Sequence, residues 1–185
     1  MHFTVILDAN VLVPVYLRDL LLQLAYGEVF RARWTPHVCD EVRRTLVGPR
    51  FSQPADRVDR LIKLMHENVL QPMVYGYEPL IDGLSLPDLD DRHVLAAAIA
   101  SEADTVVTYN LKHFPDAALA EHGVAAIHPD EFLASQIALR PGAALKAAQT
   151  ILDRMRSPKL RKAEILDRYR RLELVHTAEE LEQLL

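Results

Sequence analysis

Short runs of apolar residues alternate along this chain with longer segments in which apolar residues recur every three or four positions. The short runs end abruptly at polar residues, which is typical of strands buried on both faces of a parallel sheet. The recurrence in the longer segments is typical of amphipathic helices. The pattern predicts strands at residues 5–7, 32–35, 104–108 and 124–127, an edge strand at 70–75, and helices at 10–26, 36–47, 54–68, 94–100, 116–122 and 129–138.

Strands that alternate with helices favour parallel pairing through right-handed crossovers. They predict a three-layer α/β/α domain around a central parallel sheet. We expect this domain to span residues 1–138. Arg140-Pro141-Gly142 has the composition of a linker. Residues 139–185 are then expected to form a helical C-terminal extension, with helices at 143–155, 159–172 and 178–185.

Composition and charge narrow the class of protein. Half of the 185 residues are hydrophobic and 25% are charged, as expected of a folded globular chain. The single Cys39 excludes an intramolecular disulfide, and neither a signal peptide nor a bilayer-length apolar segment is evident, so we expect a cytoplasmic protein without a membrane partner. The net charge is −5, yet residues 154–171 hold eight basic and two acidic residues. That segment carries +6, which leaves −11 on the remainder.

Acidic and amide residues follow the predicted strands and begin one predicted helix. Asp8 ends the first strand, with Asn10 two positions later, and both are expected at the crevice beyond the carboxyl ends of the strands. An Asp that caps the following helix is an equal alternative for Asp8. Asp88 and Asp91 are three positions apart and share a face if the helix extends back to them. Carboxylates that converge need a cation, and an all-oxygen set favours Mg²⁺ or Mn²⁺ over Zn²⁺.

The ordered set of these motifs resembles the PIN-domain nucleases. It consists of Asp8-Ala9-Asn10, Glu41 within the segment 35–41, Asp88 and Asp91 before Val94-Leu95-Ala96-Ala97-Ala98, and Val106-Val107-Thr108-Tyr109-Asn110. The resemblance covers residues 4–135 and is greatest to the VapC-type toxins of toxin–antitoxin pairs. It implies that Asp8, Glu41 and Asp91 bind metal, with Asn10 and Thr108 supporting them. Many members carry an acid where this chain has Asn110, so Asn110 itself, Asp88 or Asp116 is the candidate for the fourth position.

The resemblance implies an endoribonuclease that uses Mg²⁺ or Mn²⁺ to hydrolyse RNA and that a small antitoxin holds inactive, with the toxin as a homodimer. Two alternatives within the family are an RNA-binding module with weakened catalysis and a housekeeping RNA-processing nuclease. A phosphatase of the haloacid-dehalogenase type also begins with a strand that ends in Asp. That family has Asp-x-Asp, and Asn10 stands at its second acidic position here.

Basic residues offer candidate RNA contacts. Arg43 and Arg44 follow Glu41, and the tail contributes Lys159, Arg161 and Lys162, together with further arginines up to Arg171. Phosphate contacts of this kind give affinity without sequence choice. The alternative for the tail is that it folds back on the acidic domain or docks the antitoxin. The eight histidines lack the spacing of a zinc site, and for His93 and His113 structural roles are favoured.

Overall fold

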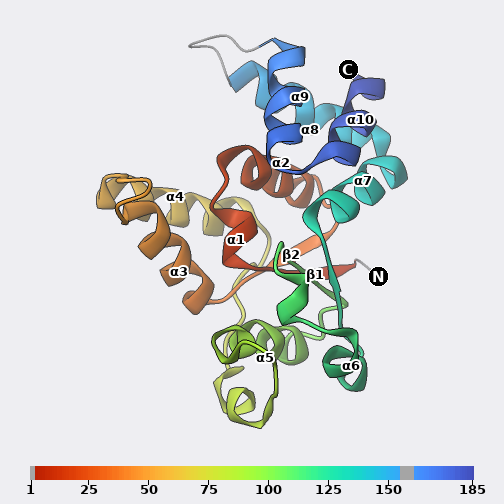
Figure 1. Ribbon diagram of the computed structural model, residues 1–185. Helices are drawn as coiled ribbons and strands as arrows, with labels where there is room; N and C mark the ends of the chain where they lie inside the picture. The colour runs from red at the N-terminus through yellow and green to blue at the C-terminus, as the bar shows by residue number, and fades with distance from the viewer. Residues whose placement is uncertain (1–2, 155–160) are drawn as a thin grey trace.

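The computed structural model describes residues 3–154 and 161–185. Its sheet has four parallel strands in the order β2-β1-β3-β4. The strands are β1 (Thr4–Leu7), β2 (Arg31–Arg33), β3 (Thr105–Val107) and β4 (Ala125–Ile127). Helices cover both faces (Figure 1), so the predicted three-layer α/β/α architecture with C-terminal helices is confirmed.

Alternate residues of the central strands point into two separate cores. Val5, Leu7 and Val107 belong to a large core that they share with α1, α2, α3, α4 and the C-terminal helices. Ile6 and Val106 point the other way, into a smaller core with α5 and α6. The helices are α1 (Ala9–Leu12), α2 (Val15–Tyr26), α3 (Pro36–Val47), α4 (Ala55–Asn68), α5 (Arg92–Ala100) and α6 (Asp116–Leu119).

Short 3₁₀ helices occupy several connections, namely η1 (Glu78–Gly83), η2 (Leu89–Asp91), η3 (Leu111–His113) and η4 (Ala120–His122). The helix predicted at 10–26 is interrupted, because Pro14 has extended backbone (ψ 120°) and separates α1 from α2. The edge strand predicted at 70–75 is reduced to one bridge between Trp34 and Met73. Pro72 has no N–H to offer a ladder, and Gln71 turns the chain with a φ of 47°.

The C-terminal part consists of α7 (Pro129–Leu139), α8 (Pro141–Arg154), α9 (Lys162–Arg171) and α10 (Val175–Leu184). The linker predicted at Arg140-Pro141-Gly142 is wrong, since α8 begins at Pro141, a helical position where a missing N–H costs nothing. The Asp130 carboxylate on α7 accepts hydrogen bonds from the backbone N–H groups of His176 (3.1 Å) and Thr177 (2.7 Å). Asp130 therefore caps the first turn of α10 from a different helix.

Tyr109, just beyond β3, joins this C-terminal part to the sheet. Its hydroxyl donates a hydrogen bond of 2.8 Å to the backbone oxygen of Leu172, at the end of α9. Within the described ranges, no helix is both long enough and apolar enough to cross a membrane.

Candidate functional site

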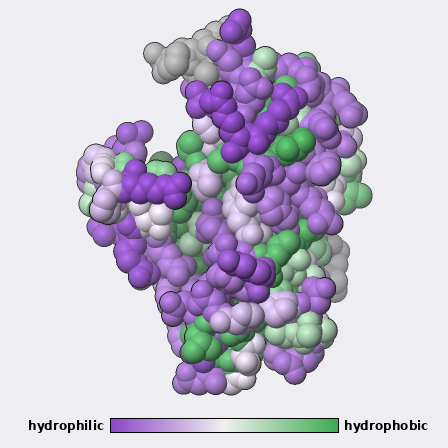
Figure 2. Space-filling model, in the orientation of Figure 1, coloured by the Kyte–Doolittle hydropathy of each residue, from purple (hydrophilic) through white to green (hydrophobic). Residues whose placement is uncertain are grey.

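A cleft of about 780 Å³ opens at the carboxyl ends of β1 and β3. Its lining comes from α1, α3, the start of α5, the segment after β3 and the end of α9, and it includes Asp8, Asn10, Glu41, Asp91 and Asn110. The surface on the face shown in Figure 2 is largely hydrophilic. In the sheet β1 lies between β2, the next strand in the sequence, and β3, so the strand order reverses at β1. The cleft lies at this switch point, which is where parallel α/β sheets bind ligands.

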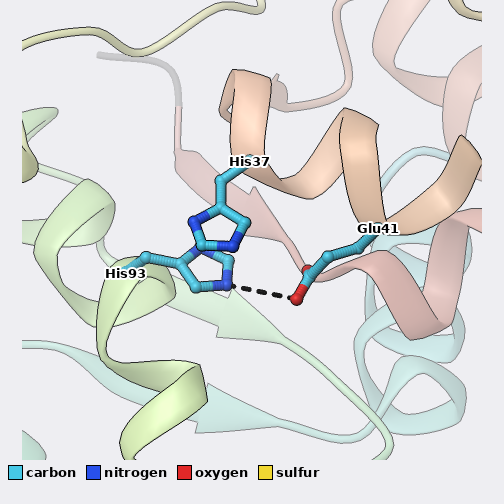
Figure 3. A group of neighbouring side chains, drawn as sticks. All are labelled: His37, Glu41 and His93. Carbon is cyan, nitrogen blue, oxygen red and sulfur yellow. Dashed lines mark ion pairs between the residues drawn. The ribbon is translucent and has the colours of Figure 1, made fainter. Parts of the chain in front are cut away.

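Glu41 comes from α3, which Thr35 caps by accepting a hydrogen bond from Val38 N–H at 3.1 Å. Its carboxylate lies 3.5 Å from Nε2 of His93, which is in the first turn of α5 (Figure 3). The His37 ring stacks on the His93 ring with centroids 3.9 Å apart. Burial lowers the pKa of His37, and the neighbouring His93 lowers it further. Glu41 therefore lines the cleft with the imidazole rings of His37 and His93 beside it.

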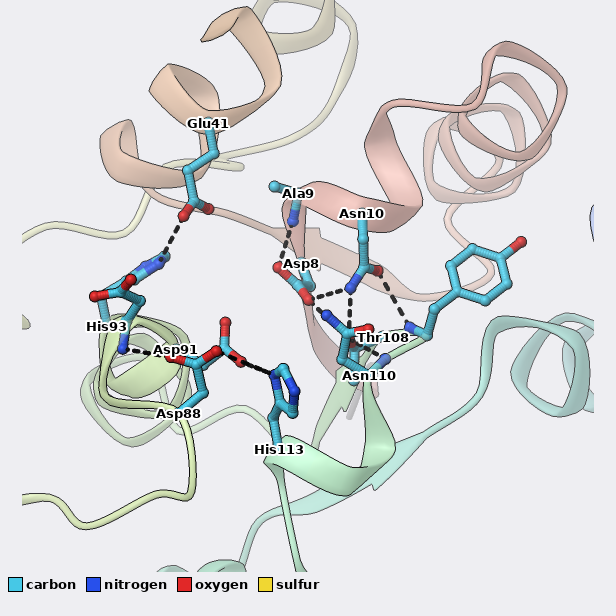
Figure 4. A network of polar contacts seen from close by, with 12 residues as sticks. Asp8, Ala9, Asn10, Glu41, Asp88, Asp91, His93, Thr108, Asn110 and His113 are labelled. Atoms are coloured by element: carbon cyan, nitrogen blue, oxygen red, sulfur yellow. Dashed lines mark hydrogen bonds and ion pairs between the residues drawn. The ribbon is translucent and has the colours of Figure 1, made fainter. Parts of the chain in front are cut away.

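Asp8 lies at the floor of the cleft, directly after β1, and its side chain is 5% exposed. Its Oδ1 accepts a hydrogen bond from Ala9 N–H at 2.6 Å, so Asp8 does cap α1. Its Oδ2 accepts from the Asn10 amide (2.6 Å) and from the Thr108 hydroxyl (2.7 Å), as Figure 4 shows. Capping and a place in the cleft, which the sequence presented as alternatives, coexist in one side chain.

Asn10 and Thr108 tie the ends of β1 and β3 together. The Asn10 amide also donates to the Thr108 hydroxyl oxygen at 2.9 Å, and its oxygen accepts from Tyr109 N–H at 3.1 Å. The same Thr108 oxygen accepts from the backbone N–H of Asn110 at 3.0 Å. These bonds fix the Asp8 carboxylate from α1 and from the segment after β3, and they place Asn110 at the cleft.

The Asp8 carboxylate is held in an environment that disfavours its charge. Burial raises its pKa to about 6, and the nearby carboxylates of Asp91 and Glu41 add to the shift, against the hydrogen bonds from Thr108 and Ala9. The pKa of Asp91 is also raised, first by burial, although its bond to His113 opposes this. Acids thus crowd around one space at a cost to their charged forms, and a cation there would reverse that effect.

Asp91 lies at the junction of η2 and α5, where the chain brings Asp88 beside it. Nδ1 of His113, in η3, is 2.6 Å from Asp91 Oδ2 and 3.6 Å from Asp88 Oδ2. Asp88 caps the three-residue η2 and Asp91 ends it, so both carboxylates are near the same imidazole. His113, for which the sequence favoured a packing role, therefore orients the acid that faces the cleft.

Several residues that the sequence singled out lie elsewhere. Arg43 is outside the cleft lining and forms an ion pair with Asp59 at 2.6 Å, whereas its neighbour Arg44 lines the cleft. Asp116 is exposed at the start of α6 and is not part of the lining. Of the three candidates for a fourth ligand, Asn110 lines the cleft, whereas Asp88 lies outside the lining but shares His113 with Asp91.

The basic tail is partly neutralised by acids of its own helices. Arg161 is exposed, 3.6 Å from Glu164, and Lys162 donates to the backbone oxygen of Glu182 at 3.0 Å. Lys159 lies outside the described residues. Of the tail arginines that the structure describes, Arg171 lines the cleft.

Sequence reasoning named neither Arg50 nor His37, counted Arg171 only among the basic residues of the tail, and favoured a structural role for His93. Arg50 and Arg171 line the cleft, the first from the segment after α3 and the second from the end of α9. His37 and His93 flank Glu41. The four-residue spacing of His37 and Glu41 on one helix was a signal that could have been used, because it places both side chains on one face.

The donor set fits a hard divalent cation. Asp8 Oδ2 accepts two hydrogen bonds but Oδ1 accepts one, so a lone pair of Oδ1 is available to an ion. Glu41, Asp91 and the Asn110 amide add oxygen atoms from the other sides of the cleft. Ligands of this kind suit Mg²⁺ or Mn²⁺.

Comparison with known proteins gives two matching families. The PIN domain matches residues 4–112, and the VapC50 C-terminal domain matches residues 129–183. The "Putative ribonuclease VapC50" of Mycobacterium tuberculosis (strain ATCC 25618 / H37Rv) is 49% identical over 65 residues, which are 35% of this chain and 38% of that protein. The similarity thus spans less than half of the relative's length. No solved structure matches the chain.

Proposed function

Because this chain belongs to the PIN-domain family, in its VapC type, we propose that it is a divalent-metal-dependent endoribonuclease. The observation that carries the proposal is the convergence of Asp8, Glu41 and Asp91 on one cleft, with Asp8 fixed by three hydrogen bonds. The relative's printed name, a ribonuclease, supports RNA as the substrate.

In this proposal Asp8, Glu41 and Asp91 hold the cation, with Asn110 or Asp88 at a fourth position. A bound Mg²⁺ or Mn²⁺ supplies charge neutralisation for a phosphodiester and activates water for its hydrolysis. Asn10 and Thr108 keep Asp8 in place, and His113 keeps Asp91 in place. Buried, hydrogen-bonded ligands need little reorganisation when the cation and substrate arrive.

Arginines at the mouth of the cleft are proposed to bind the RNA backbone. Arg44, Arg50 and Arg171 approach from three different segments, and each is exposed. A charged rim of this kind contacts phosphates and gives salt-dependent affinity. The acidic floor repels a polyanion until a cation neutralises it, so the rim and the cation act together.

Cleavage of RNA by the purified chain in Mg²⁺, in Mn²⁺ and in EDTA tests the proposal. Asp91→Asn should lower the rate by at least ~100-fold in either metal, because it removes a ligand charge. Asp90→Asn is the matched control, since Asp90 is adjacent and exposed but does not line the cleft. Full activity of Asp91→Asn, or equal activity of the parent in EDTA and Mg²⁺, would contradict the assignment.

The proposed biological role is that of a cytoplasmic toxin that acts as a homodimer under the control of a small antitoxin. Expression of the chain should then arrest growth, and expression of Asp91→Asn should not. Co-expression of a small protein encoded beside the gene should relieve the arrest. Normal growth with active nuclease would instead favour a housekeeping role in RNA processing.

A further inference from the structure

Two histidines and a carboxylate meet where α3 faces the first turn of α5. His37 and Glu41 are one helical turn apart on α3 and project from the same face. His93 projects toward them from α5 (Figure 3). One ligand atom from each of the three side chains lies within 4.8 Å of the other two.

The spacing of His93 and Glu41 suits a small cation better than a direct hydrogen bond. Nε2 of His93 and Oε1 of Glu41 are 3.5 Å apart. Ligands about 2.0–2.1 Å from a tetrahedral Zn²⁺ lie about 3.3 Å from one another, so a modest contraction would bring these two atoms onto one ion. The His37 ring stacks on the His93 ring, so the His37 side chain must rotate to direct a nitrogen lone pair at the same ion. A direct hydrogen bond between an imidazole and a carboxylate is shorter, at about 2.7–2.9 Å.

His93 supplies an independent indication of a ligand. Its side chain is 2% exposed, and among the described residues neither ring nitrogen has a hydrogen-bond partner. A buried polar group without a partner destabilises the fold, because its lost hydration is not replaced. The nitrogen nearest Glu41 points toward the carboxylate, as Figure 3 shows, so an ion between them would satisfy it.

We propose that His37, Glu41 and His93 form a binding site for a first-row transition-metal ion, with Zn²⁺ as the representative and Mg²⁺ excluded by the two imidazoles. Imidazole nitrogen suits Zn²⁺, whereas Mg²⁺ selects oxygen. His37 is exposed, so the fourth position is open to solvent. Glu41 also belongs to the group of carboxylates, with Asp8 and Asp91, that is proposed to hold the catalytic cation. The proposal of this metal site is separate from that of the nuclease function. Zn²⁺ binding can be measured in the absence of RNA, so the two proposals are tested independently.

Calorimetric titration of the metal-free full chain with ZnCl₂ tests the site, with MgCl₂ titrated in parallel. His37→Asn should weaken Zn²⁺ binding by at least ~10-fold, since loss of an outer partner of a ligand alone has that effect. Its Mg²⁺ binding should be unchanged. His93→Asn should weaken Zn²⁺ binding as well, but the exposed His37 is the primary variant because its replacement leaves the core intact.

Two controls separate this trio from other histidine positions. His122→Asn, in η4 and beside Glu121, should bind Zn²⁺ as the parent does. His113→Asn tests the neighbouring group of Asp88, Asp91 and His113 and should also retain the Zn²⁺ affinity. Parent-like Zn²⁺ binding by His37→Asn would overturn the proposal, as would a loss confined to His113→Asn. Failure of RNA cleavage would leave these titrations unaffected, so the two proposals fail separately.

Discussion

The floor and the rim of the cleft are built in opposite ways. At the floor, Asp8 is 5% exposed and accepts three hydrogen bonds, from Ala9 and Asn10 on α1 and from Thr108 just beyond β3. At the rim, Arg44 and Arg171 are exposed, and among the described residues no hydrogen bond holds their guanidinium groups. The difference indicates that the floor holds its side chains in one geometry, whereas the side chains at the rim are able to reorient.

The largest effect is expected from breaking the floor itself with Asp8→Asn. RNA cleavage in Mg²⁺ should fall by at least ~100-fold, because a buried ligand charge is lost. Burial raises the pKa of Asp8 from 3.8 to about 6, so the folded protein keeps the proton that the unfolded chain releases between these pH values. In EDTA the free energy of unfolding should therefore be highest below about pH 4 and should fall as the pH rises through 6. In Asp8→Asn that pH dependence should flatten, as denaturant unfolding between about pH 4 and 7 would show. Retention of both the rate and the pH dependence would remove Asp8 from the site.

Thr108→Val tests whether the hydrogen bonds at the floor matter beyond packing. Thr108 is fully buried, and its hydroxyl serves Asp8, Asn10 and the backbone of Asn110. The change should cost about 1–3 kcal/mol of unfolding free energy, because buried donors lose their acceptor. Cleavage should fall about 10-fold through kcat, with KM little changed. Thr105→Val, at the start of β3, is the control, and an equal loss there would indicate a packing effect alone.

Asn110→Asp sharpens the comparison by adding charge to the floor. A fourth carboxylate should tighten Mg²⁺ binding about 10-fold, and without metal it should lower stability through repulsion from Asp8 and Asp91. Asn110→Ala should weaken binding. The two variants are compared by Mg²⁺ titration and by thermal unfolding in EDTA. If both bind Mg²⁺ as the parent does, Asp88 becomes the candidate for the fourth ligand.

The smallest effect is expected at the rim. Arg44→Gln should raise KM a few-fold and reduce the salt slope of RNA binding by about 0.7 for each phosphate that the arginine neutralises in the parent, with kcat unchanged. Arg43→Gln is a matched control on the adjacent helical position, because Arg43 is paired with Asp59 and does not line the cleft. Binding of RNA is measured from about 50 to 200 mM salt. An equal effect of both variants would mean that the rim acts only through net charge.

The floor was accessible from the sequence because parallel strands bring their carboxyl ends to one edge. Asp8 and Thr108 each follow a strand that was predicted to be buried, and the family resemblance suggested that Thr108 supports the site; the structure shows that the two strands are adjacent. The three-layer fold was predictable from the alternation of strands with helices. Local rules also had limits: Pro14 splits a helix whose leucine spacing is continuous, and Pro141 begins a helix where it resembled part of a linker.

The position of Arg171 at the rim and the contact of His93 with Glu41 could not be predicted from the sequence in this way. Arg171 reaches the cleft because α9 packs beside α2 and ends next to Tyr109, an arrangement set by tertiary packing. His93 meets Glu41 from another helix, and no periodic pattern connects them. Single helices and strands have periodic signals, whereas contacts between distant helices depend on crossing geometry that a single sequence does not encode locally.

The bond between Thr108 and Asp8 joins residues 100 positions apart. Closing so long a loop comes late in folding, after the local helices have formed. During synthesis Asp8 leaves the ribosome long before Thr108, and Leu172, which accepts the Tyr109 hydrogen bond, leaves later still. A nascent chain therefore contains Asp8 before it contains the partners that fix it. Completion of the site is thereby coupled to completion of the fold, and partial chains that end before Thr108 are expected to be inert.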